Sequence, residues 1–231
     1  MAEPPTVPYT GQKRHRLRIR SLGEITLPIA RVSPDLHIAS FVLIDNYDLV
    51  KKLSEILARQ VAKYNPEYLL CVEAKSLPLT YAICDHLNTL YRRRRKKTRV
   101  RFIVVRKTKK VYMKSPYSVT MKSITTREQQ KLFIDKIDVA KLRRHSFVLV
   151  DDVISTGSTI NALLRLLKRI RLSPSAICTV LFEGETGPDK VAYPHKSKVH
   201  ALGRIPLYVN SSKQFNRRYG KPAQVSHIRV K

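Results

Sequence analysis

The chain has 231 residues, which is enough for one α/β domain with appendages, and 43% of them are apolar. Lysine and arginine number 45 against 17 acids, so the formal net charge is +28. No apolar stretch approaches the roughly 20 residues that span a bilayer, and the N-terminus lacks an apolar signal core, so we expect a cytoplasmic protein without a membrane partner. The three widely spaced cysteines are expected to be buried free thiols.

The basic charge is unevenly distributed along the chain. Residues 91–127 contain 15 basic residues and no acid, and residues 190–231 contain ten more, again without an acid. Near the start, arginines at positions 14, 16, 18 and 20 alternate with other residues, so a strand there would carry them on one face. This density favours a polyanionic partner, either nucleic acid or a multiply phosphorylated small molecule, although a solvated cationic surface explains it equally well.

The first half of the chain reads as short strands followed by a helix, a strand and a second helix. Strands are expected within residues 16–20, 24–32 and 37–45. Leucines, isoleucines and valines then recur at helical spacing over residues 46–64, with Asp45 or Asn46 as the cap. A buried strand should follow over 68–74, and a helix over 78–93 that opens with Pro78.

The second half continues the alternation. Strands are expected over residues 100–105, 147–152 and 176–184, and a helix over 159–170, whereas 106–127 reads as a long basic loop with at most a hairpin. This order predicts an α/β fold with a twisted parallel sheet and helices on both faces. Ligands bind such sheets at the carboxyl ends of the strands, and the segments VEAKS (72–76), RKTKK (106–110) and DDVISTGST (151–159) all fall at that edge. We expect three divisions: N-terminal strands that form a hood over 1–45, a core over 46–183, and closing strands with a basic C-terminal extension over 184–231.

The segment FVLVDDVISTGSTI carries the clearest chemistry. Two carboxylates, Asp151 and Asp152, end a strand, and a hydroxyl-rich turn then leads into a helix. Hydroxyls, backbone N–H groups and the helix macrodipole together form a site for a phosphate monoester, and Gly157 lets the backbone approach it closely. The two acids can accept hydrogen bonds from a vicinal diol. A phosphate site beside a carboxylate pair describes a ribose 5-phosphate site, and no Walker or dinucleotide-binding motif competes with it.

This segment resembles the signature of the type I phosphoribosyltransferases, which bind 5-phosphoribosyl-1-pyrophosphate (PRPP). Upstream, PEYLLCVEAKSLPLTYAI resembles the pyrophosphate loop of the adenine phosphoribosyltransferase-like branch. The stretch VRFIVVRKTKKVYMKSPYSVTMKSITTREQQKLFID is similar to the strand and flexible loop of archaeal and bacterial members, and FEGE and LGRIPLYV match their closing strands. The resemblance covers about residues 20 to 210.

The resemblance implies transfer of phosphoribose from PRPP to a purine in purine salvage, with adenine favoured and AMP and pyrophosphate as products. It also implies a homodimer and Mg²⁺ bound through PRPP rather than directly by the protein. The catalytic pair would be Asp151 and Asp152. The 5-phosphate would be bound by Ser155, Thr156, Gly157, Ser158 and Thr159, and the pyrophosphate by Ala74, Lys75, Ser76, Arg106, Lys107 and Lys110, the last three across a dimer interface as in relatives. The base would lie between Leu27, Ile29 and Arg31 of an N-terminal hood and Val153 and Ile154 of a floor, although each of these five is equally well explained as a core residue.

Two features depart from the family pattern. Ser76 stands where many relatives have glycine, and residues 91–127 contain no acid to move the purine proton, so Glu128 is the nearest carboxylate and the general acid stays unassigned. The alternative function is a regulator of the same fold that senses PRPP or a nucleotide and binds DNA or RNA through residues 92–97 and the basic tail. A second alternative is the same reaction with hypoxanthine, guanine or xanthine.

Overall fold

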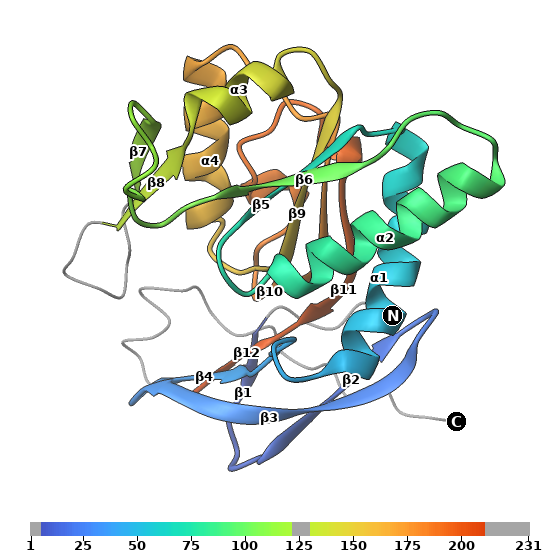
Figure 1. Ribbon diagram of the computed structural model, residues 1–231. Helices are drawn as coiled ribbons and strands as arrows, with labels where there is room; N and C mark the ends of the chain where they lie inside the picture. The colour runs from blue at the N-terminus through green and yellow to red at the C-terminus, as the bar shows by residue number, and fades with distance from the viewer. Residues whose placement is uncertain (1–5, 122–129, 211–231) are drawn as a thin grey trace.

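The computed structural model describes residues 6–121 and 130–210. Its centre is a five-stranded parallel sheet in the order β11-β10-β9-β5-β6 (Figure 1). This confirms the predicted parallel α/β sheet. The strands are β5 (Tyr68–Val72), β6 (Arg101–Val105), β9 (Phe147–Ile154), β10 (Ala176–Glu183) and β11 (Val199–Ile205).

Helices cover both faces of the central sheet. Helices α1 (Tyr47–Val61) and α2 (Leu77–Arg93) pack into one apolar core, whereas α3 (Lys136–Leu142) and α4 (Ser158–Arg169) pack into the other (Figure 1). Asn46 caps α1, because its Oδ1 accepts a hydrogen bond from the backbone N–H of Leu49 at 3.1 Å. Within residues 6–121 and 130–210, short 3₁₀ helices span Ala62–Tyr64, Pro188–Lys190 and Lys196–Lys198.

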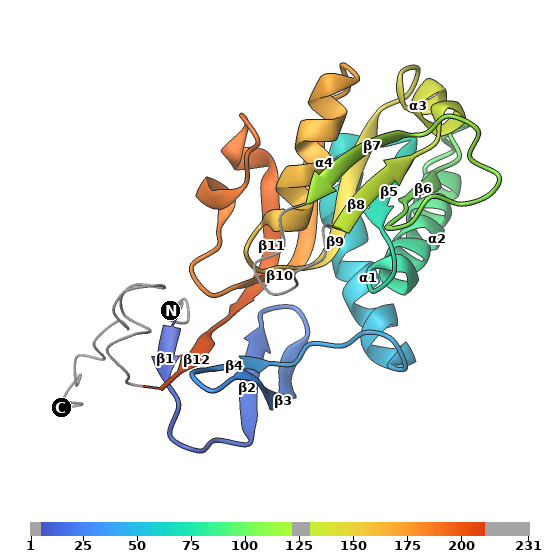
Figure 2. The same ribbon diagram turned by 90° about the vertical axis from the view of Figure 1, so that its left-hand side faces the viewer.

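A second sheet, which we call the N-terminal sheet, lies at one end of the core (Figure 2). In β2 the arginines at positions 14, 16 and 18 are exposed while the intervening residues are buried, which confirms the predicted alternation. The last strand returns from the far end of the chain to lie between two N-terminal strands. In order across the sheet the strands are β1 (Thr6–Pro8), β12 (Leu207–Val209), β4 (Leu36–Ala39), β3 (Gly23–Ser33) and β2 (Arg14–Ile19).

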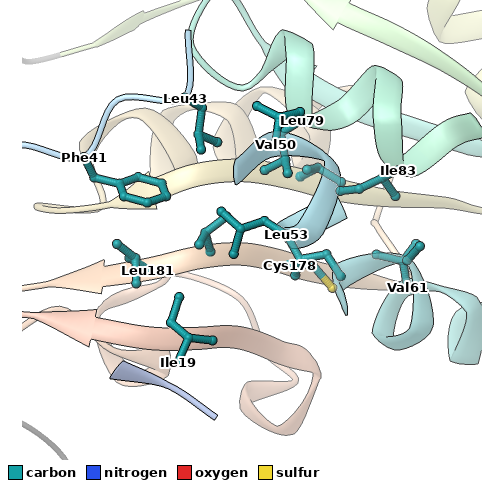
Figure 3. Packing of buried hydrophobic residues seen from close by; sticks show 14 of the residues in the cluster. Ile19, Phe41, Leu43, Val50, Leu53, Val61, Leu79, Ile83, Cys178 and Leu181 are labelled. Atoms are coloured by element: carbon teal, nitrogen blue, oxygen red, sulfur yellow. The ribbon is translucent and has the colours of Figure 1, made fainter. Parts of the chain in front are cut away.

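The N-terminal sheet shares the apolar core of α1 and α2. Ile19 of β2 lies near Leu181 of β10 (Figure 3), and both belong to one buried cluster. Gly203 of β11 makes room for this contact, since an added Cβ would lie 3.3 Å from Leu181 and 3.6 Å from Ile19. The N-terminal sheet is therefore fixed against the central sheet by buried side chains.

Several local features differ from the sequence prediction. The expected strand over 37–45 ends at Ala39, because residues 40–46 turn into α1 with Asp45 in the left-handed region at φ 74°. The basic stretch does contain a hairpin strand, β7 (Tyr117–Met121), paired with β8 (Gln130–Ile134), and neither β8 nor α3 was predicted.

Two further predictions concern burial and membranes. All three cysteines are free and buried, as expected, and burial raises the pKa of Cys71 to about 11 and that of Cys178 to about 12. Within the described residues, no helix is both long enough and apolar enough to cross a bilayer.

Candidate functional site

The hydroxyl-rich turn between β9 and α4 encloses a small cavity. Residues 153–160 and Asp151 line this space of about 110 Å³. Gly157 adopts φ 73°, and an added Cβ would lie 3.1 Å from Nδ2 of Asn161. Asn161 in turn donates to the carbonyl of Lys190 at 3.0 Å and accepts from the backbone N–H of Ala192 at 2.7 Å. The turn therefore needs glycine, and Asn161 anchors the neighbouring loop to α4.

A second cavity, of about 120 Å³, adjoins the first at the carboxyl ends of three neighbouring strands. It is lined by residues 72–76 after β5, by Lys107 after β6, and by Asp151, Asp152 and Val153 of β9 with Thr159 of α4. Three segments that the sequence placed at one sheet edge thus meet in one space. Positive side chains from two loops face a pair of carboxylates across it.

The two carboxylates occupy different environments. Burial, together with the charge of Asp152, raises the pKa of Asp151 well above its usual range. The backbone N–H of Asp152 donates to Oδ1 of Asp151 at 3.0 Å, and Thr179 donates to the Asp152 carbonyl at 3.1 Å. Neither bond uses the carboxylate of Asp152. The pair is held in place by β10 while retaining acceptor atoms for a ligand.

Glu73 organises the basic loop, and sequence reasoning did not identify it. Its Oε1 accepts the backbone N–H of Lys107 at 2.5 Å, and its Oε2 accepts from Arg106 at 3.2 Å. Burial alone would raise the pKa of Glu73, but the bonds from Lys107 and Arg106 and the charge of Lys110 bring it below the ordinary value. Arg106 is therefore paired with Glu73 of its own chain. Lys107 lines the cavity of the same chain.

Ser76, the departure from the family pattern, fits its position without strain. Its backbone is right-handed, with φ −79°, at the start of α2. The buried hydroxyl donates to the carbonyl of Val72 at 2.9 Å, and the Ser76 carbonyl accepts from Thr80 at 2.7 Å. The loop before this residue contains a cis peptide between Glu73 and Ala74. Glycine is not required at position 76 in this loop.

Glu183 and Thr186 extend the site beyond the predicted residues. Both are buried, and Thr186 donates from its hydroxyl to the carbonyl of Ser155. Burial raises the pKa of Glu183, opposed by a hydrogen bond with Ser155 and by the charge of Lys75. The available signal was an acid in FEGE at the end of a buried strand, which is costly unless the acid has polar partners.

The residues expected to bind a base are not brought together in the structure. Leu27 is buried and lines a separate cavity of about 420 Å³ between the N-terminal sheet and the start of α1. Ile29 is half-buried, and the Arg31 side chain is exposed and bonds to the carbonyl of Ser33. Val153 lines both small cavities, and Ile154, which is buried in the core beneath α4, lines only the first. Glu128 lies outside the described residues.

Metal ligands are not clustered in the described part of the chain, where no three His, Cys, Asp or Glu side chains come together to hold an ion. The oxygen atoms that would suit Mg²⁺ are those of Asp151 and Asp152, which face the cavity that also holds Lys75 and Lys107. This donor set fits an ion that arrives with a phosphorylated ligand better than one held by the protein alone.

Comparison with known proteins points to one domain family. The model of the phosphoribosyl transferase domain matches residues 44–202. The purine biosynthesis transcriptional repressor PurR of Bacillus subtilis is 24% identical over 180 residues, which cover 78% of this chain and 58% of the repressor. The hypoxanthine/guanine phosphoribosyltransferase of Methanothermus fervidus is 22% identical over 169 residues, covering 73% of this chain and 79% of that enzyme. The chain thus spans little more than half of the repressor's length.

Solved structures show the same fold. The adenine phosphoribosyltransferase of Rhodothermus marinus superposes with a TM-score of 0.55 at 15% identity, covering 83% of this chain and 94% of that one. The enzyme of that name from Thermoanaerobacter pseudethanolicus gives 0.52 at 18% identity, covering 83% and 95%. With the family model matching more than half of the sequence, and with the turn after β9 and the two loops beside it in place, the chain belongs to the phosphoribosyl transferase domain family.

Proposed function

We propose that the protein transfers the phosphoribosyl group of PRPP to a purine, with adenine favoured, and releases AMP and pyrophosphate. The observation that carries this proposal is the pair of adjoining cavities that share Asp151, Val153 and Thr159. One is lined by the phosphate-binding turn and the other by Lys75 and Lys107. The turn would bind the 5-phosphate of PRPP, the carboxylates its ribose, and the two lysines its pyrophosphate. The two cavities together thus offer one site for each of the three parts of PRPP.

The chemistry follows from these positions. As the bond between C1 of ribose and the pyrophosphate oxygen breaks, positive charge develops on the ribose and negative charge on the leaving group. The carboxylates of Asp151 and Asp152 hold the ribose hydroxyls and favour the positive charge, while Lys75 and Lys107 favour the departing pyrophosphate. Residues 155–159 hold the 5-phosphate, so the ribose stays fixed during transfer. Bound Mg²⁺ would supply further charge neutralisation on the pyrophosphate.

The identity of the acceptor base is tested by turnover. Purified protein is assayed with PRPP and Mg²⁺ against adenine, hypoxanthine, guanine and xanthine, with each nucleoside monophosphate quantified by chromatography. We expect AMP formation to have the highest kcat/KM. A higher value with hypoxanthine or guanine would replace adenine while keeping the reaction, and failure with all four bases would refute the enzyme proposal.

A regulator of the same fold is the second candidate. The similarity to PurR and the net charge of +28 favour it, because a single PRPP needs far fewer cations than this chain carries. This candidate predicts that PRPP binds without turnover and changes affinity for DNA or RNA. Measuring duplex binding with and without saturating PRPP separates it from a simple enzyme, since an enzyme alone shows no such dependence.

We also propose a homodimer. Tyr81 of α2 is 67% exposed and meets the partly exposed Phe102 edge-on, with ring centroids 6.3 Å apart. Beside them lies a largely apolar cavity of about 620 Å³ that includes the exposed Tyr47. A second copy would cover this surface. Light scattering should give twice the chain mass, and Tyr81→Asp should give the monomer; a wild-type monomer at micromolar concentration would refute this arrangement.

A further inference from the structure

Cations gather at the edge of the central sheet that lies opposite the candidate site. In a parallel sheet, the segments that precede the strands all lie at one edge and the segments that follow them at the other. The helices that lead into these strands end away from the N-terminal sheet (Figure 1 and Figure 2). We call this surface the basic edge. Its exposed cations are Arg59, Lys63, Arg92, Arg93, Arg94, Arg95, Lys96, Lys97, Arg99, Arg101, Lys141, Arg143, Arg144, Lys168, Arg169, Arg171, Lys196 and Lys198.

This charge is mostly uncompensated. Three acids near the basic edge, Glu55, Glu67 and Asp138, pair with Arg59, His145 and Lys141 respectively. Among the described residues, no ion pair is formed by any of the six cations over 92–97, all of which are exposed. Cations near a helix C-terminus interact favourably with the helix macrodipole, but one or two per helix suffice for that interaction. The surplus points to an external polyanion.

The backbone gives a second, independent observation. Arg95 and Arg171 adopt φ 54° and φ 58°, in the left-handed region that favours glycine. Each occupies the position after the C-cap of a helix, in a Schellman arrangement. Lys96 N–H bonds to the Tyr91 carbonyl at 2.9 Å, and Leu172 N–H bonds to the Leu167 carbonyl at 2.8 Å. Two helices that end at the same edge thus carry arginine where glycine would be the more stable choice. The backbone conformation at these two positions therefore does not account for the choice of arginine.

The segment over 92–97 is also held in place. Lys96 donates to Oδ1 of Asn65 at 2.5 Å, which ties the end of α2 to the turn before β5. The same ammonium group lies 4.7 Å from the centre of the Tyr91 ring. Because these contacts fix the backbone, the neighbouring guanidinium groups are presented from an ordered surface and lose less entropy when they bind.

We infer that the basic edge binds the phosphate backbone of a double-stranded nucleic acid, an inference that rests on the nucleic-acid binding of the second candidate function and does not depend on the transfer reaction. Cations distributed across several helix ends suit an extended array of phosphates, which a small phosphorylated metabolite does not provide. The exposed Phe102 packs against Tyr81, and Tyr91 is buried, so these rings are not available for stacking on unpaired bases. The eight residues of β9 separate this edge from the phosphate turn by about 25 Å, so both ligands can bind together.

The test uses the full chain and two variants that each remove two positive charges. The edge variant is Arg95→Gly with Arg171→Gly, and the control is Arg14→Gln with Arg18→Gln on the exposed face of β2. Because glycine suits both left-handed positions, the edge variant should melt at the same or a higher temperature than wild type. Binding to a labelled duplex of about 20 base pairs, as DNA and as RNA, is followed by anisotropy from about 50 to about 200 mM salt.

We expect wild type and control to bind a duplex with similar affinity, and the edge variant to bind on the order of 10- to 100-fold more weakly near about 100 mM salt. The slope of log affinity against log salt should decrease in magnitude by about two for the edge variant, since each lost phosphate contact contributes roughly 0.9. An equal loss in the control would show a general charge effect and overturn the assignment. Equal affinity for single strands, or binding to phosphatidylserine vesicles without binding to duplex, would also overturn it.

Discussion

Replacing Asp151 with asparagine should separate stability from function. Burial and the neighbouring Asp152 raise the pKa of Asp151, so ionising this carboxyl group costs more in the folded protein than in the unfolded chain. Between the ordinary value of about 3.9 and the raised value, the folded state binds more protons than the unfolded state, so stability falls as pH rises through that window. Asparagine removes the charge, so Asp151→Asn should match or exceed the melting temperature of wild type at pH 8.

Turnover should change in the opposite direction. A hydrogen bond to a charged acceptor contributes about 1.5–3 kcal/mol, and losing one from a ribose hydroxyl corresponds to roughly 10- to 150-fold in kcat/KM. Loss of the charge beside a developing cation adds to this effect. Initial rates of nucleotide formation at pH 8 under varied PRPP give kcat and KM, and scanning calorimetry at pH 5 and pH 8 gives the stability arm.

Asp138→Asn is the matched control. It removes a carboxylate from α3 that pairs with Lys141 at 2.8 Å, at the edge of the central sheet opposite the turn (Figure 1). This variant should keep wild-type kcat/KM. If Asp151→Asn retained kcat/KM within about threefold of wild type, the assigned ribose contact would be wrong. If it melted well below wild type at pH 8, the cost assigned to ionising Asp151 would be wrong.

Three further substitutions test the loops. Gly157→Ala should destabilise the protein by about 1–2 kcal/mol and lower the melting temperature in calorimetry by about 2–8 °C. The reason is that φ at this position is 73° and the new Cβ would lie 3.1 Å from Asn161. An unchanged melting temperature would contradict this geometry. Ser76→Gly should lower the free energy of unfolding in urea by about 0.5–2 kcal/mol without raising turnover, because Ser76 has a right-handed backbone and its buried hydroxyl donates a hydrogen bond. A gain in kcat would instead indicate that glycine is needed. Lys107→Ala should raise KM for PRPP at least tenfold and weaken inhibition by pyrophosphate, while titration calorimetry should give an unchanged affinity for ribose 5-phosphate. The control is Lys114→Ala, at an exposed lysine. Equal effects of the two variants would show that Lys107 is not part of the pyrophosphate site.

Local patterns predicted the parts of the site that depend on adjacent residues. The strand, carboxylate pair, turn and helix over 147–169 follow from an apolar run, a glycine and hydroxyl-rich turn, and helical spacing within one segment. The Asn46 cap is similarly local. The meeting of residues 72–76 with Lys107 at one edge followed from the parallel order of the strands.

Features that depend on distant residues were not predictable in the same way. Glu73 accepts from Lys107, 34 positions later, only because β5 and β6 pair in one register. The N-terminal sheet includes β12 from near the end of the described chain. The left-handed backbone of Arg95 was also unforeseen, because arginine carries no signal for it and the glycine that usually marks such a position is absent.

The central claim is that the turn after β9 and the loops beside it bind PRPP. Titration calorimetry of the wild-type chain with PRPP in the presence of Mg²⁺, with ribose 5-phosphate titrated in parallel, tests it most directly. The site as built predicts that both bind with one ligand per chain, and that PRPP binds at least tenfold more tightly because Lys75 and Lys107 also contact its pyrophosphate. Absence of PRPP binding at millimolar concentration, from protein whose melting is cooperative, would contradict it.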